Sequence, residues 1–316
     1  MAKSEVHVAE YSVVANAPAQ VVFDTYVQAE RWPQLFTNIV HAEYLTREEG
    51  QDAVELWALA GENAVRHWVS RRTIDREGLR VAFTNDPALP PLAEAGGEWT
   101  FAPLPDGSTK VVIRHEFSLV EGADIPPERI AKEFEKHSTR QLAELKTAAE
   151  RAEELVDLTV DFEDPLFVGG SAEDAWVVLY EADKWPERLS HVKALTMTED
   201  VPGIQFFDMD TTTSDGRPHR TRSVRVCLPH RKIVYKQVQP PPLLEVHTGH
   251  WSFTPTREGV VVASRHTVTI RPAKLHLLGE GTTVEDARKY LRRILSTNSM
   301  TNLRLAKSYA EEKAGV

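Results

Sequence analysis

The chain has 316 residues, which at roughly 150 residues per domain is enough for about two domains. It is 41% hydrophobic and 27% charged, as is usual for a globular protein and unusual for a disordered or fibrous one. The formal net charge of −10 argues against general binding to nucleic acids or anionic membranes, since both favour a basic surface.

Three features of the sequence bear on where the protein works. The single cysteine, Cys227, excludes an internal disulfide and a cysteine-based metal cage, which fits a reducing compartment. No apolar run follows Lys3, so we expect no secretion signal. The chain also lacks a run of eighteen apolar residues, so we expect no membrane-spanning helix. These features together predict a cytoplasmic protein.

The first half of the chain predicts a fixed order of elements. An opening stretch with Val6, Val8, Tyr11 and Val13 alternates as a strand does, and Asn16-Ala17-Pro18 predicts the start of a helix that ends before Trp32-Pro33. Pro126-Pro127 opens a long helix that we expect to reach about Glu154. Between the helices lie six stretches rich in β-branched and aromatic residues, namely 38–46, 53–60, 64–75, 79–85, 95–102 and 109–119.

Short motifs of the first half return in the second half, in the same order and shifted by 151 to 153 residues. Five matches in register indicate a duplication of a whole domain, because the period is too long for a solenoid repeat. We therefore predict domains at 1–154 and 155–316, the second with a strand at 156–162, a helix from Ser171, six strands and a helix from Thr283 to about Lys313. The matching motifs are Ala29–Pro33 with Ala182–Pro186, Ser70–Arg72 with Ser223–Arg225, Pro90–Glu94 with Pro241–Glu245, Gly97–Phe101 with Gly249–Phe253, and Arg114-His115 with Arg265-His266.

This element order predicts an α+β fold in each copy. A seven-stranded antiparallel sheet twists and curls, and a long helix laid across its concave face encloses a pocket. The residues of interest are therefore those on the inward face of the strands and on one side of the terminal helix.

The stretch 64–75 places Arg66, Trp68, Ser70 and Arg72 on one face of a strand. If that face points inward, an arginine lies in the pocket, where it requires a carboxylate partner or a ligand. The alternative is a solvated strand with the intervening residues pointing inward, and the pattern favours neither. The second copy places Thr221, Ser223 and Arg225 in register.

Further candidates are two histidines and one helix face. His115 and His266 each follow an arginine in the last strand, where a neutral imidazole can transfer a proton or serve as a structural residue. On the second terminal helix, Asn298, Thr301 and Asn302 share a face that is either a polar pocket wall or an exposed stripe.

One local stretch of the acidic chain is basic. It is either a solvated strand pair or a docking site for an acidic carrier domain or a phosphopantetheine phosphate. The sequence contains no glycine-rich phosphate loop, no Gly-x-Ser-x-Gly elbow and no HExxH zinc signature. The basic stretch comprises Arg217, His219, Arg220, Arg222, Arg225, His230, Arg231 and Lys232.

Four segments together resemble the polyketide aromatase/cyclases of bacterial type II polyketide synthases. They are Trp32–Phe36 with the following Ala42–Leu45, Trp68–Arg72, Trp99–Phe101 and His115–Phe117. Because the same skeleton returns in 156–313, the whole chain resembles the two-domain subclass of that family. The family fold is the helix-grip, START-like domain.

The resemblance implies an enzyme that binds a poly-β-ketone tethered to an acyl carrier protein and forms the first aromatic ring, between C7 and C12, by aldol closure and loss of water. It implies no metal and no organic cofactor, and other synthase subunits as partners. It also implies catalytic roles for Arg72, Ser70, His115, Arg225, Ser223 and His266, and substrate contacts from Trp32, Trp68, Trp99, Trp185, Trp251, Asn298 and Asn302.

The chain departs from the family pattern at a few positions. Ile39 stands where single-domain relatives have a tyrosine, His115 stands where they have a glutamine, and Leu142 stands at the place of a helix asparagine that Asn302 restores in the second copy. We expect both pockets to bind, with cyclisation and dehydration divided between them.

Two other classes of protein remain open from the sequence. A non-catalytic carrier of lipids or hydrophobic metabolites would have mainly apolar cavities with the arginines outside, and a tandem scaffold would have filled cores. The Ser-x-Arg strand, present twice, favours the enzyme.

Overall fold

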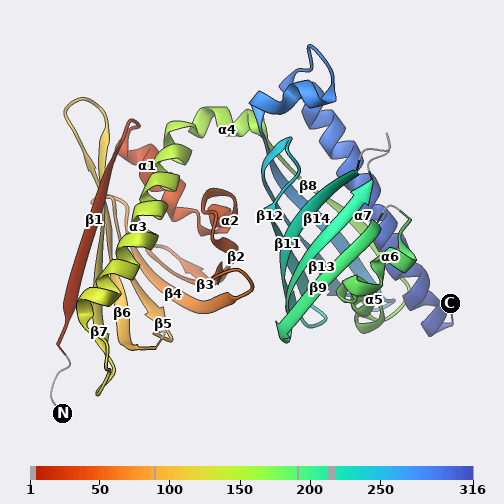
Figure 1. Cartoon of the computed structure of the whole chain (residues 1–316), viewed down its shortest axis with the longest axis horizontal. Helices are drawn as coiled ribbons and strands as arrows, with labels where there is room; N and C mark the ends of the chain where they lie inside the picture. The colour runs from red at the N-terminus through yellow and green to blue at the C-terminus, as the bar shows by residue number, and fades with distance from the viewer. Residues whose placement is uncertain (1–4, 89, 191, 213–217, 316) are drawn as a thin grey trace. The chain divides into compact units, whose positions relative to one another are not determined.

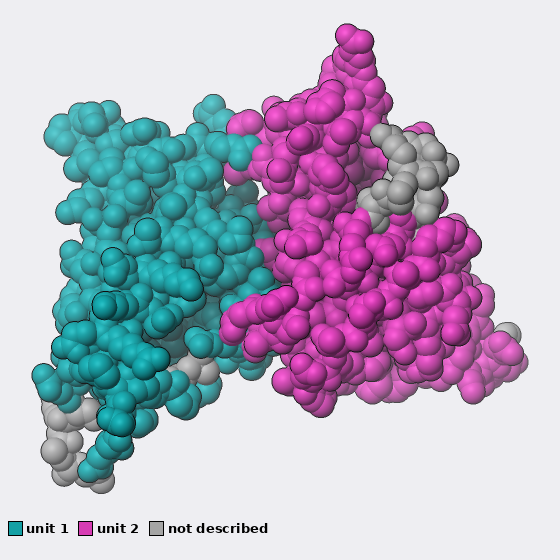
Figure 2. Space-filling view, viewed as in Figure 1, with its two compact units in different colours: residues 1–59, 66–153 teal, residues 60–65, 154–316 magenta. Residues whose placement is uncertain are grey.

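The structure is a computed structural model, and it describes residues 5–88, 90–190, 192–212 and 218–315. The chain divides into two compact units, which Figure 2 shows in different colours. Unit 1 comprises residues 1–59 and 66–153, and unit 2 comprises residues 60–65 and 154–316.

Unit 1 is a single seven-stranded sheet combined with helices (Figure 1). The sheet order is β1-β7-β6-β5-β4-β3-β2, so that the first and last strands in sequence pair with each other. A helical turn at Ala29–Arg31 links α1 to α2. The elements are β1 (His7–Ala15), α1 (Ala19–Val27), α2 (Trp32–Leu35), β2 (Ile39–Glu48), β3 (Gln51–Leu59), β4 (Val65–Asp75), β5 (Arg80–Asp86), β6 (Leu92–Pro103), β7 (Thr109–Leu119) and α3 (Pro127–Glu150).

Unit 2 repeats this plan after a short helix, α4 (Ala152–Leu158). Its sheet order, β8-β14-β13-β12-β11-β10-β9, is that of unit 1 strand for strand. Its elements are β8 (Thr159–Val168), α5 (Ala172–Tyr180), α6 (Trp185–Arg188), β9 (Val192–Val201), β10 (Ile204–Thr212), β11 (Pro218–Leu228), β12 (Lys232–Gln239), β13 (Leu244–Pro255), β14 (Val260–Ile270), a 3₁₀ segment Pro272–Leu278 and α7 (Val284–Ala314).

The long helix of each unit lies against its sheet (Figure 1). Each of these helices buries one stripe of side chains. On α3 the buried residues Ser138, Leu142, Leu145 and Ala149 recur every three or four positions, as a helix of 3.6 residues per turn requires. On α7 the stripe Ser299, Leu303, Ala306 and Ala310 has the same spacing. Gln141, and not Leu142, is therefore the counterpart of Asn302.

The predicted α+β duplication is confirmed, and the differences from the sequence prediction are local. The stretch 156–162 was expected to be a strand, but α4 continues to Leu158 and β8 begins at Thr159. Ser171 and Thr283 cap their helices through Asp174 and Asp286, as their sequence patterns indicate.

The start of α1 directly follows Asn16-Ala17-Pro18, as predicted, but Asn16 does not cap the helix. Pro18 is the capping residue and makes no side-chain bond, while the Asn16 N–H donates to Glu150 at 2.6 Å. Asn298 and Thr301 on α7 are exposed to solvent, which agrees with the exposed stripe that the sequence left open and contradicts the substrate contact that the resemblance implied for Asn298. The buried face of α7 runs through Leu291, Ser299 and Leu303. Of the polar residues predicted on this helix, Asn302 alone lies on that face. Within the described ranges, no helix has the length and apolar character that crossing a membrane requires.

The buried face of α7 can be tested by two substitutions on the same helix. We expect Leu303→Ala to lower the free energy of unfolding of unit 2 by about 2–5 kcal/mol, because Leu303 is fully buried. Asn298→Ala is the matched control and is expected to change it by no more than about 0.5 kcal/mol. Denaturant unfolding followed by tryptophan fluorescence measures both, and equal losses would contradict the assigned face.

Candidate functional site

The residues on β4 settle which face of that strand points inward. Ser70 and Arg72 are buried, Trp68 is half-buried, and Arg66 at the strand's beginning is exposed. His67, Arg71 and Thr73 on the other face are exposed. The arginine predicted to enter the interior of unit 1 does so, with only 2% of its surface exposed.

Arg72 is held by a carboxylate and by a helix end. Its Nε and Nη2 donate to the two carboxylate oxygens of Asp52 on β3, each at 2.7 Å, and Nη2 also donates to the carbonyl of Val27 at 3.0 Å. Val27 is the last residue of α1, where carbonyls have no partner within the helix. The guanidinium lies 5.2 Å from the centre of the Trp32 ring. Arg72 thus joins two strands, a helix end and the Trp-Pro turn.

One nitrogen of this guanidinium remains unused. Nη1 of Arg72 is buried and has no hydrogen-bond partner within the described part of the chain. Burial on its own lowers the pKa of Arg72, but the bonds to Asp52 outweigh it and the pKa is raised above its ordinary value. The group is therefore a permanent cation with one donor nitrogen that the described residues leave without a hydrogen bond.

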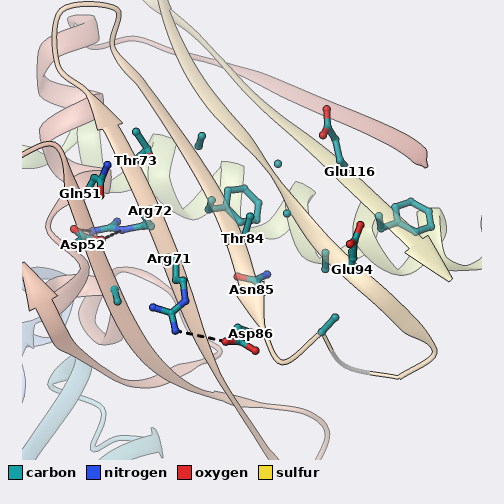
Figure 3. Close-up of a pocket in the computed structure, with 18 of the residues that line it drawn as sticks. Gln51, Asp52, Arg71, Arg72, Thr73, Thr84, Asn85, Asp86, Glu94 and Glu116 are labelled. Carbon is teal, nitrogen blue, oxygen red and sulfur yellow. Dashed lines mark hydrogen bonds and ion pairs between the residues drawn. The ribbon is translucent and has the colours of Figure 1, made fainter. Parts of the chain in front are cut away.

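Arg72 and Asp52 lie on the wall of a cavity of about 1000 Å³ (Figure 3). Figure 3 shows Arg72 reaching to Asp52, whereas Arg71 extends toward Asp86, 3.6 Å away. Phe83 adds an apolar surface to the same wall. Polar side chains on other strands also line the cavity, among them Thr84, Asn85, Glu94 and Glu116.

The predicted tryptophans of unit 1 lie behind this wall. Trp32 and Trp99 are core residues, packed with Tyr26, whose ring centre is 5.3 Å from that of Trp32 and 4.5 Å from that of Trp99. The indole N–H of Trp32 donates to the carbonyl of Tyr26 at 2.8 Å. Trp68 packs against the edge of the same core. Trp32 supports the guanidinium of Arg72 and is itself fully engaged.

His115 is buried between β7 and α3. Its Nε2 lies 2.8 Å from the hydroxyl oxygen of Ser138, and its ring stacks on Phe134 at 4.3 Å. Burial, with a smaller contribution from His137, lowers the pKa of His115 to about 4. The imidazole is thus neutral at pH 7 and is a hydrogen-bonding group or weak base there, not a cationic acid.

In unit 2, Arg225 occupies the place of Arg72 with different partners. Its Nε donates to Gln205 at 2.9 Å, its Nη1 to the carbonyl of Leu179 at 2.8 Å and its Nη2 to the carbonyl of Tyr180 at 2.6 Å. All three nitrogens are engaged, and burial lowers the pKa of Arg225. The negative charge that balances Arg225 is that of Glu199, which is not bonded to the arginine but accepts a hydrogen bond from Gln205 at 2.8 Å.

Tryptophans accompany this arginine as well. The guanidinium of Arg225 lies 5.3 Å from the Trp185 ring, whose N–H donates to Val178 at 3.3 Å. Trp251 packs against Trp185 with ring centres 6.1 Å apart. Ser223, two residues before Arg225, is also buried.

His266 belongs to a larger hydrogen-bonded group than His115 does. Its Nδ1 lies 2.7 Å from the hydroxyl of Tyr235 and 3.1 Å from Nε2 of His247, and its Nε2 bonds with the hydroxyl of Ser299. Gln237 completes the group, 2.8 Å from Nδ1 of His247. Burial, followed by Arg292 and His250, lowers the pKa of His266 to about 3, so it too is neutral at pH 7.

The interior of unit 2 also contains polar atoms that the protein leaves unbonded. Nε1 of Trp251, Oδ1 of Asn302 and Oγ1 of Thr221 are buried without a hydrogen-bond partner among the described residues. A buried polar atom without a partner is unfavourable, so these atoms indicate contact with water or a ligand.

The basic stretch does not form a single positive surface. Arg225 is buried, Arg222 pairs with Asp208 at 2.8 Å, and Arg220 lies 3.9 Å from both Asp208 and Asp210. Arg217 and the side chain of His219 lie outside the described residues. The acidic side chains of β10 offset this charge, which favours the solvated strand pair.

Sequence reasoning missed several residues that the structure places in these sites, and four of them are central. Asp52 and Gln205 are the arginine partners, and Tyr235 and His247 extend the group around His266. The duplication held a usable signal, because Asp52 precedes Arg72 by the same interval as Gln205 precedes Arg225. For Tyr235 and His247 the only signal in the sequence is a difference between the two copies, because unit 1 has Phe83 and Ala95 at the matching positions.

Comparison with known proteins finds a family match for each unit. Residues 6–150 and residues 168–290 each match a family described as polyketide cyclase/dehydrase and lipid transport. The chain is 39% identical to the actinorhodin polyketide synthase bifunctional cyclase/dehydratase of Streptomyces coelicolor over 98% of this chain and 99% of that protein. It is 36% identical to the granaticin polyketide synthase bifunctional cyclase/dehydratase of Streptomyces violaceoruber over 97% and 95%.

Solved structures of two-domain proteins match over the same length. The di-domain ARO/CYC StfQ from the steffimycin biosynthetic pathway superposes with a TM-score of 0.86 at 54% identity, covering 97% of this chain and 99% of that one. The di-domain ARO/CYC BexL from the BE-7585A biosynthetic pathway superposes with a TM-score of 0.85 at 35% identity, covering 96% and 99%.

The chain belongs to the two-domain polyketide aromatase/cyclases of type II polyketide synthases. It is an enzyme of the bifunctional cyclase/dehydratase class in aromatic polyketide biosynthesis. Within the described ranges, no group of three or more His, Cys, Asp or Glu side chains is arranged to hold a metal ion.

The ion pair of unit 1 generates a stability prediction. We expect Asp52→Ala to lower the free energy of unfolding by about 3–5 kcal/mol, because it leaves a buried guanidinium without its counter-charge. The double variant Asp52→Leu/Arg72→Met removes both charges and is expected to recover part of this loss. Denaturant titration measures the free energy of unfolding of both variants. If the double variant is less stable than Asp52→Ala, so that the effects of the two substitutions simply add, the pairing is contradicted.

Two of the buried histidines, His115 and His266, generate a pH prediction. Their folded pKa values of about 4 and about 3 lie below the ordinary 6.5, so between these limits the unfolded chain binds protons that the folded chain does not. Stability is therefore fully present above 6.5 and falls as the pH drops below it. We expect His115→Gln to flatten the fall in unfolding free energy between about pH 7 and about pH 5, and an unchanged slope would contradict the burial of a neutral imidazole.

Proposed function

We propose that this enzyme folds a poly-β-ketone carried by an acyl carrier protein, closes its first ring by an aldol reaction between C7 and C12, and dehydrates that ring to an aromatic one in antibiotic biosynthesis. The observation that supports this most directly is Arg72, a buried cation on the wall of a cavity, with Nη1 unused.

The ring closure places negative charge on one oxygen. A methylene carbon loses a proton and bonds to a ketone carbon, and the ketone oxygen becomes an alkoxide that is then protonated. A fixed donor aimed at that oxygen stabilises the developing charge more than it stabilises the ketone. Nη1 of Arg72 meets this requirement, because Asp52 and Val27 already hold the rest of the guanidinium.

The cavity supplies the second part of the rate enhancement. A long flexible chain bent into one conformation brings the two reacting carbons together, which lowers the entropic part of the barrier and fixes which carbons join. We assign to Ser70, which is buried on the same face of β4 as Arg72, the role of bonding a neighbouring carbonyl, and the half-buried Trp68 precedes it on that face. Trp32 and Trp99 act through the position of Arg72 and the packing behind it.

The roles of the two arginines differ in this proposal. Arg225 engages all three of its nitrogens with Gln205 and the end of α5, so its main role is to hold unit 2 together. Arg72 retains a free nitrogen and therefore carries the polarising role.

The alternative of a lipid carrier fits the cavity less well. A carrier of hydrocarbon chains favours an apolar lining, whereas this cavity combines Phe83 with Arg72, Asp52, Asn85 and Glu94. A chain that carries an oxygen on every second carbon is the better match to such a wall.

Replacement of Arg72 tests the proposal. We expect Arg72→Ala to slow formation of the cyclised product by roughly 10²–10³, the usual effect of losing one oxyanion donor. The measurement is product yield in a mixture with the minimal polyketide synthase, with the position of the new bond determined by NMR. Arg80→Ala is the matched control, because Arg80 is exposed and pairs with the exposed Asp75.

Arg72→Lys provides a version that keeps the charge and separates catalysis from folding. A lysine keeps the positive charge, but its ammonium group lacks the planar guanidinium geometry that bonds both oxygens of Asp52 and leaves a third nitrogen for a ligand. Folded Arg72→Ala and Arg72→Lys proteins that keep the wild-type yield would contradict the role of Arg72, and a ring closed between other carbons would contradict the assigned regiochemistry.

A further inference from the structure

Five polar side chains in unit 2 form one connected group in the interior. Tyr235 and Gln237 come from β12, His247 from β13, His266 from β14 and Ser299 from α7. Tyr235, His247, His266 and Ser299 are each at least nine-tenths buried. A buried polar network is stable only when its members satisfy one another, so its geometry is tightly specified.

Unit 1 lacks most of this group although it is built on the same plan. Strand pairing places Phe83 opposite Arg72 and Tyr235 opposite Arg225. His115 and Ser138 repeat the pair formed by His266 and Ser299. The position of His247, two residues before the glycine that pairs with the histidine, is Ala95 in unit 1. The fold thus does not require the extra tyrosine and histidine.

The hydrogen bonds assign the protons of the network. Gln237 Oε1 accepts from Nδ1 of His247, so Nε2 of the neutral His247 ring is an acceptor. The Nδ1–H of His266 lies between this Nε2, at 3.1 Å, and the Tyr235 oxygen, at 2.7 Å. Nε2 of His266 then accepts the proton of the Ser299 hydroxyl. With these bonds made, neither imidazole needs the proton of the Tyr235 hydroxyl, which is available to a bound oxygen.

Two side chains next to members of this network carry polar atoms that the described residues leave unsatisfied. The ring of Trp251, whose Nε1 has no partner in the described ranges, has its centre 5.1 Å from that of Tyr235. Asn302, with an unpartnered Oδ1, lies one helical turn beyond Ser299 on the buried face of α7. A donor and an acceptor thus remain for a ligand that carries oxygen atoms.

We propose that unit 2 is the dehydration site and that Tyr235, backed by His266 and His247, delivers the proton that lets water leave. The inference rests on the proposed function, because the substrate is the cyclised β-hydroxy ketone that ring closure produces. Unit 1, with Phe83 in place of the tyrosine, performs the ring closure.

The step is balanced in atoms and charge. The Ser299 oxygen accepts the proton from the carbon beside the ketone while the Ser299 hydroxyl gives its own proton to Nε2 of His266, and Nδ1 of His266 gives its proton to the Tyr235 oxygen. Tyr235 gives its own proton to the departing hydroxyl, the C–O bond breaks, a C=C bond forms and water leaves. The imidazole stays neutral throughout because it accepts and gives one proton, which agrees with the depressed pKa that burial imposes on it.

Tyr235→Phe tests this assignment and installs the side chain that unit 1 has at the same place. In the full-length protein mixed with the minimal polyketide synthase, we expect ring closure at the wild-type rate and dehydration slowed by roughly 10²–10⁴, the usual contribution of a general acid. Rapid quenching and mass spectrometry should then show a cyclised product heavier by one water. Tyr290→Phe, on the same unit but outside this network, is the matched control.

His247→Ala is a second variant and copies Ala95 of unit 1. We expect it to slow dehydration as well, with ring closure retained, because Tyr235 and His266 lose the acceptor that orders their protons. A Tyr235→Phe protein that dehydrates at the wild-type rate overturns this inference alone. A Tyr235→Phe protein that loses both steps equally assigns Tyr235 a structural role and also overturns it. A wild-type protein that closes no ring overturns the proposed function together with it.

Discussion

The structure depends on one interaction in each unit, a buried guanidinium that spans a strand, a helix end and a tryptophan ring. Taking an arginine out of water is unfavourable unless its donors and its charge are matched, so the surroundings of Arg72 and Arg225 are strongly constrained. Each arginine takes the last carbonyls of the first helix, which fixes where that helix ends and where the Trp-Pro turn begins. This accounts physically for the presence of the same strand and turn motifs in both copies.

The two copies have diverged around that shared anchor. Asp52 forms an ion pair with Arg72 and leaves one nitrogen of Arg72 without a bond to any described residue. Gln205 instead accepts a hydrogen bond from Arg225 and donates one to Glu199, and all three nitrogens of Arg225 are bonded. The same wall of the sheet then carries Phe83 in unit 1 and Tyr235 in unit 2. An aldol closure needs a polarising cation and a dehydration needs a proton-delivering hydroxyl, and these are the roles that we propose for Arg72 and Tyr235.

Much of the fold followed from the sequence, because repeated motifs and strand periodicity are local signals. The alternation in 64–75 correctly placed Arg72 and Ser70 on one face of the strand but left open which face was inside. The inward face depends on the ion pair with Asp52, which lies 20 residues earlier in the sequence. The face of α7 that carries Asn298 and Thr301 was considered as a pocket wall because these residues are polar. The buried face lies one position further along the chain, because Leu303 and Ala306 are buried in the core of unit 2. Tyr235 and His247 meet only through strand pairing, which no short pattern in the sequence encodes.

The central claim is that a substrate oxygen binds the unused nitrogen of Arg72. The most direct measurement is a crystal structure of the protein with a stable poly-β-ketone analogue in the cavity of unit 1. We expect a ligand oxygen at about 2.7–3.2 Å from Nη1, with the contacts of Arg72 to Asp52 and Val27 unchanged. An analogue seated in that cavity with all its oxygens directed elsewhere, and Nη1 still without a partner, would contradict the claim.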